Sequence, residues 1–253
     1  MEVSDMLYNV NDLKGFELRA TDGEIGKTID FLFDDEQWAI RYMDARAGNW
    51  LTGQRVLISP ISLGSPDWEA EQIPVHLTRE QIRNSPSLAT DQPVSRRFEQ
   101  RFFSYYGYGY YWMGDQIWGA GMYPAELENV ANELGADEDQ GDEHLRSVDE
   151  VAGYNVMAGG EKTGEVTGFL VEDGTWKIRY IVVDTGRWLS HHRVVIPSHW
   201  ITDISWADHR VEVSVSGEQL ESAPVYPDED PVTREYEEKY FRHFGREPYW
   251  RSQ

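Results

Sequence analysis

The sequence predicts a mainly β fold of two small β-barrels in tandem, each followed by a short amphipathic helix and an aromatic tail. Three observations support this prediction. The chain of 253 residues repeats itself at one constant offset, which carries Trp50 onto Trp188. Each copy holds short runs rich in Val, Ile and aromatic residues, separated by Gly, Asp and Thr. After each copy, apolar residues recur at helical spacing and lead into clustered aromatic residues.

The internal repeat needs no gap. The stretch "IRYMDARAGNWLTGQRVLISP" (residues 40–60) resembles "IRYIVVDTGRWLSHHRVVIPS" (residues 178–198). The same offset places the tail residues Tyr111-Trp112 on Tyr249-Trp250. Chance similarity would not keep rare Trp positions in register, so the repeat predicts two copies of one folding unit.

The repeat also sets the expected domain boundaries. We expect a first barrel, a first aromatic helical tail, an acidic spacer, a second barrel and a second tail over residues 1–86, 87–112, 113–144, 145–224 and 225–253. The spacer contains no Lys or Arg. It is interpreted as a loop, a short helix from about Pro124 to Leu134 that ends at Gly135, and a mobile linker.

Within each copy, local signals predict individual elements. In "KIRYIVVD" (residues 177–184) both alternating sets of residues are largely apolar, which predicts a central strand. A one-turn helix with a capping box is predicted twice, from Thr78 to Gln81 and from Ser216 to Gln219. The carboxylate pairs Asp34-Asp35 and Glu172-Asp173 follow predicted strands, where Asp is typical of a turn.

Composition excludes several classes of function. The chain has no cysteine, which excludes disulfides, thiolate nucleophiles and cysteine-rich zinc sites. Its formal net charge of −22 predicts no direct binding to nucleic acid or anionic lipid. No apolar run approaches bilayer length, so we expect a cytoplasmic protein without membrane insertion. The charge is interpreted as a source of solubility or adaptation to a salty cytoplasm, with a basic protein partner as an alternative.

Both copies resemble the PRC-barrel family, the small β-barrel of the photosynthetic reaction-centre H subunit and of a ribosome-maturation factor. The matching marks are Gly15 and Gly153, the turns at Gly26 and Gly164, "IRY" on the central strand, the Gly-x-Trp-Leu stretches at 48–51 and 186–189, and the strand Arg-Val-x-Ile. The membrane helix of the H subunit and the RNA-associated domain of the maturation factor are absent from this sequence. The resemblance therefore implies a docking or assembly fold without catalytic residues.

Candidate sites for chemistry are weak. His191 and His192 could bind a metal, but neighbours on a strand point to opposite faces, and the first copy has Gly53-Gln54 there. No nucleophile stands beside a recognisable base, so we expect no enzyme activity and no cofactor. Asp44 falls on the face where the second copy has Val182. It is interpreted as lying at a solvated strand end, the alternatives being a polar opening or an Arg partner.

The aromatic tails are the best candidates for an interface. Val94, Phe98, Phe102 and Tyr105 lie at helical spacing, as do Val232, Tyr236, Tyr240 and His243. We expect contacts that cross a boundary between barrels or between chains from Tyr105, Tyr106, Tyr111, Trp112, Phe241, Phe244, Tyr249 and Trp250.

The sequence thus predicts a non-enzymatic protein-interaction or assembly module, such as a stress-related scaffold, which binds a protein partner or self-associates. Two alternatives remain open. One is a ligand- or metal-binding module with its site at His191, His192 and a cleft between the barrels. The other, which rests on the family resemblance alone, is a regulator of a photosynthetic or redox membrane complex.

Overall fold

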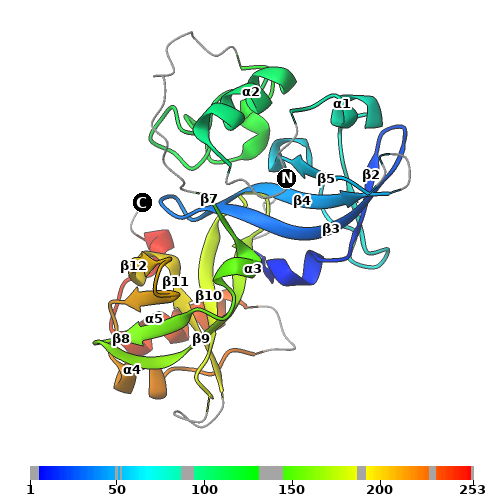
Figure 1. Cartoon of the computed structure of the whole chain (residues 1–253). Helices are drawn as coiled ribbons and strands as arrows, with labels where there is room; N and C mark the ends of the chain where they lie inside the picture. The colour runs from blue at the N-terminus through cyan, green and yellow to red at the C-terminus, as the bar shows by residue number, and fades with distance from the viewer. Residues whose placement is uncertain are drawn as a thin grey trace. The chain divides into compact units, whose positions relative to one another are not determined.

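The computed structural model describes residues 6–48, 51, 53–86, 94–130, 145–186, 192–227 and 232–251, and its strands confirm a mainly β protein (Figure 1). The chain divides into two compact units, named here after their central strands. The β4 unit comprises Asp12–Ser147 and Gly174–Lys177. The β10 unit comprises Met1–Asn11, Val148–Asp173 and Ile178–Gln253.

The β4 unit is built on a six-stranded sheet in which the two longest strands, β3 and β4, pair antiparallel (Figure 1). Within this described sheet, the pairing of β2 with β6 is parallel. The strand order is β5 (Arg55–Ile58), β4 (Ala39–Ala47), β3 (Gly23–Asp34), β2 (Glu17–Ala20) and β6 (Gln72–Pro74), with β7 (Leu145–Ser147) added beside β3.

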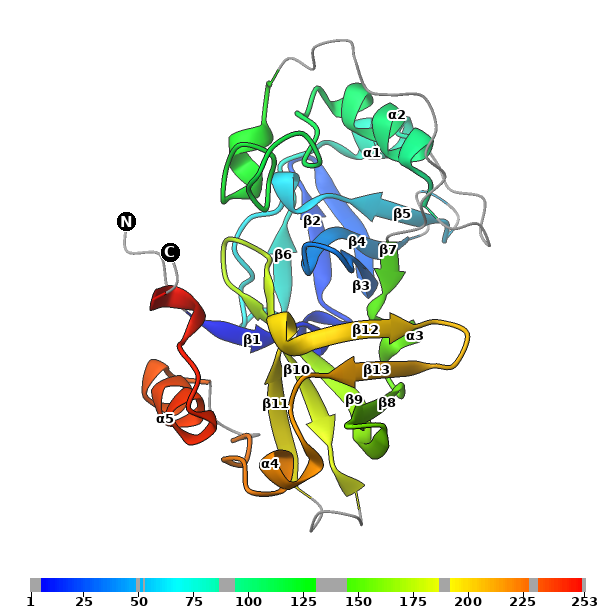
Figure 2. The ribbon, with the colours of Figure 1, turned by 90° about the vertical axis from the view of Figure 1, so that its left-hand side faces the viewer.

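The β10 unit repeats this strand order in a seven-stranded sheet, with β12 as an additional strand at one edge (Figure 2). Its central strand β10 lies between β9 and β11, as the sequence predicts. The order is β11 (Arg193–Pro197), β10 (Ile178–Asp184), β9 (Glu161–Glu172), β8 (Asn155–Ala158), β13 (Arg210–Val213) and β12 (Ile201–Ser205), with β1 (Leu7–Asn9) beside β9.

The prediction of closed barrels is wrong, because both sheets are mixed and open. A barrel requires its first and last strands to pair. In each described sheet the edge strand instead passes into a 3-10 turn, β5 into η3 (Pro60–Ser62) and β11 into η6 (Ser198–Trp200). Pro60 and Pro197 stand at these junctions and lack the N–H that would continue the ladder.

The predicted capping boxes are present. In helix α1 (Arg79–Arg83), Gln81 N donates to Thr78 Oγ1 at 3.2 Å, and Thr78 N donates to Gln81 Oε1 at 2.8 Å. Helix α4 (Gly217–Glu221) has the same box between Ser216 and Gln219. Other short helical segments that the structure describes are α3 (Val148–Val151), η1 (Val10–Leu13), η4 (Pro124–Leu127) and η7 (Tyr249–Arg251).

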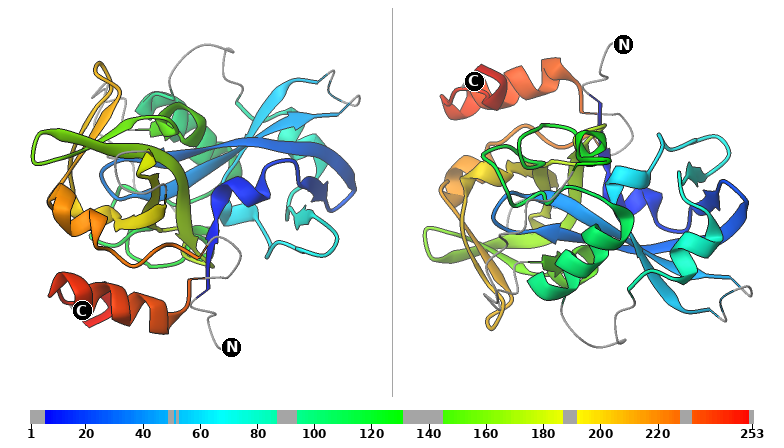
Figure 3. Two further views of the ribbon diagram at one scale, coloured as in Figure 1. Left: turned by 90° about the horizontal axis from the view of Figure 1, so that it is seen from below. Right: turned by 90° about the horizontal axis from the view of Figure 1, so that it is seen from above.

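The predicted tail helices are also present: α2 (Arg96–Tyr106) and α5 (Arg234–Phe244), of equal length. Ser95 and Thr233 cap their N-termini, and Gly107 and Gly245 end them in the left-handed region, at φ 71° and 62°. Figure 3 shows both helices, α2 in green and α5 in orange to red. Among the described residues, none of the helices is long and apolar enough to cross a bilayer.

Two parts of the prediction fall partly or wholly outside the described residues. Of the expected spacer helix, the structure shows the 3-10 turn Pro124–Leu127, and residues 131–144 are not described. Trp50 and Trp188, the centres of the Gly-x-Trp-Leu stretches, also lie outside the described residues.

Candidate functional site

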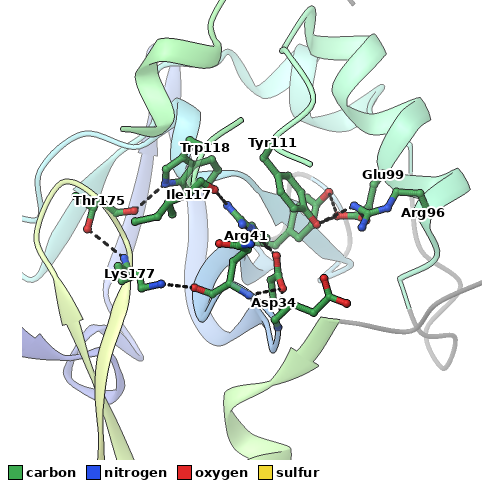
Figure 4. A network of polar contacts seen from close by, with 12 residues as sticks. Asp34, Arg41, Arg96, Glu99, Tyr111, Ile117, Trp118, Thr175 and Lys177 are labelled. Atoms are coloured by element: carbon green, nitrogen blue, oxygen red, sulfur yellow. Dashed lines mark hydrogen bonds and ion pairs between the residues drawn. The ribbon is translucent and has the colours of Figure 1, made fainter. Parts of the chain in front are cut away.

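A buried carboxylate joins the first tail helix to its sheet. Glu99 in α2 is 0% exposed, although a helix normally turns Glu toward water. Its Oε1 accepts hydrogen bonds from Tyr42 Oη at 3.2 Å and Tyr111 Oη at 2.7 Å. Its Oε2 accepts from Arg96 Nη1 at 2.9 Å. One carboxylate thus connects the helix, the central strand and the aromatic tail (Figure 4).

Arg41 extends this network from the opposite side of Tyr111. Its guanidinium is fully buried and lies 3.8 Å from the centre of the Tyr111 ring. It donates to Asp34 Oδ2 from Nε at 3.3 Å and from Nη2 at 3.0 Å. Stacking and a two-point ion pair fix its plane, which lysine could not reproduce.

Beyond Arg41 the network reaches two further loops, as Figure 4 shows. Arg41 Nη1 donates to the Ile117 carbonyl at 2.7 Å, and the neighbouring Trp118 is fully buried. Trp118 Nε1 donates to the Thr175 carbonyl at 2.7 Å. Lys177 Nζ then donates to the Gln37 carbonyl at 2.6 Å. These contacts hold the segment Gly174–Lys177 inside the β4 unit.

The β10 unit contains the same arrangement at the offset of the sequence repeat. Glu237 Oε1 accepts from Tyr180 Oη at 2.6 Å and Tyr249 Oη at 3.1 Å, and its Oε2 lies 3.0 Å from Arg234 Nη1. Arg179 pairs with Glu172 at 3.0 and 2.7 Å and lies 4.3 Å from the Tyr249 ring centre. We call this the tail clamp; its residues are Asp34, Arg41, Tyr42, Arg96, Glu99 and Tyr111 in one unit, and Glu172, Arg179, Tyr180, Arg234, Glu237 and Tyr249 in the other.

Burial raises the pKa of several side chains in the tail clamp. Desolvation raises the pKa of Glu237, and the hydrogen bond from Tyr180 and the charge of Arg234 oppose this rise. Burial also raises the pKa of Tyr42 and of Tyr111 well above the ordinary value, and the charge on Glu99 raises both further. The hydroxyls therefore keep their protons and act as donors to the carboxylate.

The second aromatic residue of each tail lies outside the clamp and is half-buried. Trp112 contacts Phe103, with ring centres 5.6 Å apart, and Arg96 lies 4.3 Å from the Trp112 ring. Trp250 contacts Phe241, also at 5.6 Å, and Arg234 lies 4.0 Å away. Trp112 also stacks on Tyr110, with ring centres 4.6 Å apart, and Trp250 lies 4.9 Å from Tyr249, so each indole is packed within its unit and only partly exposed.

The other predicted interface residues differ in exposure. Phe241 and Phe244 are buried, Tyr106 is half-buried, and Tyr105 is 41% exposed. The contacts described above for the tail residues lie within one unit. Contacts that cross between units or between chains stay a prediction.

The inward face of the tail helices is shifted from the predicted one. Phe98 and Phe102 are buried as expected, but Phe103 also points inward and Tyr105 does not. Tyr105 Oη instead donates to the Gln81 carbonyl at 2.9 Å. The hydrophobic spacing did not predict that Glu99 is buried, because a charged residue in an amphipathic helix is assigned to the solvent-facing side. The signal that could have found it is the repeat itself, which keeps the Arg–x–x–Glu spacing of Arg96 and Glu99 in both tails.

The interpretation of Asp44 as a solvated side chain is wrong. Asp44 is 2% exposed and forms an ion pair with Arg55 on the neighbouring strand β5. The alternative of an Arg partner is thus confirmed: Arg55 lies on the strand that pairs with β4, and a buried carboxylate needs such a partner. Asp34 confirms the expected turn chemistry, since its Oδ1 accepts from Glu36 N at 2.9 Å and Gln37 N at 3.0 Å.

The histidine candidates receive no support. His191 lies outside the described residues, and His192 precedes strand β11. Within the parts of the chain that the structure describes, no group of three or more His, Asp or Glu side chains could hold a metal ion.

One segment of the chain matches a known protein-family model. The PRC-barrel domain model matches residues 143–220, which include β7 to β13 and most of α4. No curated protein matches the chain.

Proposed function

We propose that the chain is a non-enzymatic protein-interaction or assembly module made of two PRC-type units. The family match covers only the second repeat. The assignment of the first repeat to the same family is supported by its equal strand order and by the clamp that it shares with the second. PRC-barrel domains often mediate protein interactions.

The observation that carries the proposal is the duplicated clamp and the tryptophan beside it. In each unit the clamp fixes the tail, and Trp112 or Trp250 beside it stays partly exposed. A partly exposed indole on a rigid support loses little entropy on binding, and Trp is enriched among residues that dominate interface energies. Two equivalent tryptophans on one chain would give a partner two similar points of attachment.

The charge of the chain favours a basic partner over a second copy. Two copies that each carry −22 repel one another, whereas a basic protein is attracted. The proposed partner is therefore a protein with a basic surface around an apolar pocket that accepts an indole.

Affinity capture with the full chain as bait tests the proposal. The variant Trp112→Ala/Trp250→Ala should capture at least ten-fold less of the partner, and raised salt should weaken capture by the unchanged chain. Trp68→Ala is the matched control, because Trp68 is 42% exposed and contacts Phe16, and neither residue belongs to a tail. Equal capture by both variants would refute the role of the tail tryptophans, and recovery of second copies alone would favour self-association.

A further inference from the structure

The first strands of the two repeats are exchanged. Strands β1 and β7 occupy equivalent places in the sequence repeat, since Leu7 corresponds to Leu145. Strand β1 pairs with β9 of the second repeat, and β7 pairs with β3 of the first. The registers are equivalent, since Leu7 lies opposite Glu172 and Leu145 opposite Asp34. Each compact unit therefore contains a strand from the other repeat.

In the pairing of β1 with β9, the side chain of Asn9 fits into the space beside Gly168. A Cβ atom added at Gly168 in β9 would lie 2.7 Å from Asn9 Nδ2 and 3.1 Å from Asn9 Oδ1. The Asn9 side chain is held in this place, because Asn11 N donates to its Oδ1 at 3.1 Å. The backbone of Gly168 is not in the left-handed region, so the contact with Asn9 is what a larger residue at position 168 would meet.

In the pairing of β7 with β3, a polar side chain on one strand meets a buried carboxylate on the other. Asp30 in β3 corresponds to Gly168, and Ser147 in β7 corresponds to Asn9. Ser147 Oγ donates to Asp30 Oδ2 at 2.5 Å, and Asp30 is 7% exposed. A buried carboxylate is costly without such donors. On the same strand, Arg146 lies 3.3 Å from Asp35 and adds a second charged contact.

We propose that the two repeats recognise each other by reciprocal strand exchange, and that Asn9 with Gly168 and Ser147 with Asp30 encode the choice of partner. If each first strand paired within its own repeat, Asn9 would lie beside Asp30 instead of Gly168. The Asp30 side chain would then occupy the space that the Asn9 side chain fills beside Gly168. Ser147 would face Gly168 and lose its acceptor. The partner that each repeat selects is thus the other repeat of the same chain.

Engineered disulfides test the exchange, because the chain contains no cysteine to interfere. Asn9 is the direct cross-strand neighbour of Leu170, and Ser147 of Leu32. Directly opposed residues of an antiparallel pair lie within disulfide range. The exchanged pairs Asn9→Cys/Leu170→Cys and Ser147→Cys/Leu32→Cys should oxidise almost completely to a monomeric product. The matched controls Asn9→Cys/Leu32→Cys and Ser147→Cys/Leu170→Cys should remain mostly reduced.

Each other outcome would overturn the proposal. Preferential oxidation of the control pairs would show that each strand stays with its own repeat. Oxidation of the exchanged pairs into covalent dimers would show that the exchange joins two copies of the chain.

A double-mutant cycle tests the encoding. Gly168→Asp alone should lower Tm by several degrees, because the new side chain meets Asn9. Adding Asn9→Ser recreates the Ser147–Asp30 pair at this position and should recover at least half of the loss. If Asn9→Ser gives no recovery, the two pairs do not encode the exchange, and Gly168 is needed for some other reason. If Gly168→Asp leaves Tm unchanged, the size of the side chain at position 168 does not determine which first strand pairs with β9.

Discussion

Glu99 and Glu237 occupy the same place in the two repeats, and each lies buried in the inward face of a tail helix with two tyrosine hydroxyls and one arginine around its carboxylate. Neither residue is part of a hydrophobic pattern. Together they show that the repeat keeps a polar junction between helix and sheet, and this junction decides how each aromatic tail is held.

The first prediction concerns the loss of this junction. Glu99→Ala leaves Tyr42 Oη without its acceptor inside the protein, so the free energy of unfolding should fall by about 2–3 kcal/mol. Glu99→Gln keeps the shape and one acceptor oxygen, and it should cost less than the alanine variant. Urea denaturation followed by circular dichroism measures both. Equal stability of the alanine variant and the unchanged chain would show that the clamp contributes nothing.

The second prediction concerns pH. Because burial raises the pKa of Glu237 above its ordinary 4.5, the folded state binds this proton more tightly than the unfolded state. The stability from this group is fully present below pH about 4.5 and is lost as pH rises through the folded pKa. Relative to Glu237→Gln, the unchanged chain should therefore gain stability as pH falls from 7 toward 4.5. Denaturation curves of both proteins across this window measure the difference, and a relative loss would contradict it.

The third prediction compares the two clamp arginines. Arg41→Met leaves the buried Asp34 without its charged partner and removes the donor to Ile117, so it should cost about 3–5 kcal/mol. Arg179 is the matched control, since its side chain is 13% exposed and its carboxylate partner Glu172 is 11% exposed. Arg179→Met should cost clearly less. Thermal unfolding of both variants gives the comparison, and an equal or reversed order would contradict it.

The fourth prediction separates the two roles of Trp118. Trp118→Phe keeps most of the buried ring but loses the hydrogen bond to the Thr175 carbonyl, which should cost about 1 kcal/mol. Trp118→Ala also leaves a cavity and should cost about 3–5 kcal/mol. Hydrogen exchange of the amides at 174–177 should rise in both variants if Trp118 holds this segment. Unchanged exchange there would assign Trp118 to general packing alone.

Much of the local structure could be predicted from sequence because local chemistry determines it. The capping boxes at Thr78 and Ser216, the tail helices that end at Gly107 and Gly245, and the central strand β10 all follow from short patterns. The caps and helices satisfy backbone hydrogen bonds locally, whereas β10 follows from its two apolar faces and bonds to β9 and β11.

The features that escaped prediction depend on residues far apart in the chain. Since the two repeats align without a gap, exchanged and unexchanged strands have the same register, and the repeat alone cannot distinguish them. The distinction depends on Asn9 beside Gly168, a contact between a residue of the first repeat and one of the second. Closure of the barrel likewise depends on whether the edge strands meet, which alternation within one strand does not encode. Glu99 escaped because its burial depends on Tyr42 and Tyr111.

Site-specific photocrosslinking tests the proposed interaction role most directly. A photoreactive phenylalanine analogue replaces Trp112, Trp250 or, as a buried control, Trp118 in the full chain, and the adducts formed in native lysate are identified by mass spectrometry. Positions 112 and 250 should form adducts with the same second protein, one with a basic surface, and position 118 should form only adducts within the chain. A lack of intermolecular adducts at both 112 and 250, or equal adducts at all three positions, would contradict the claim that the clamped tails present these tryptophans to a partner.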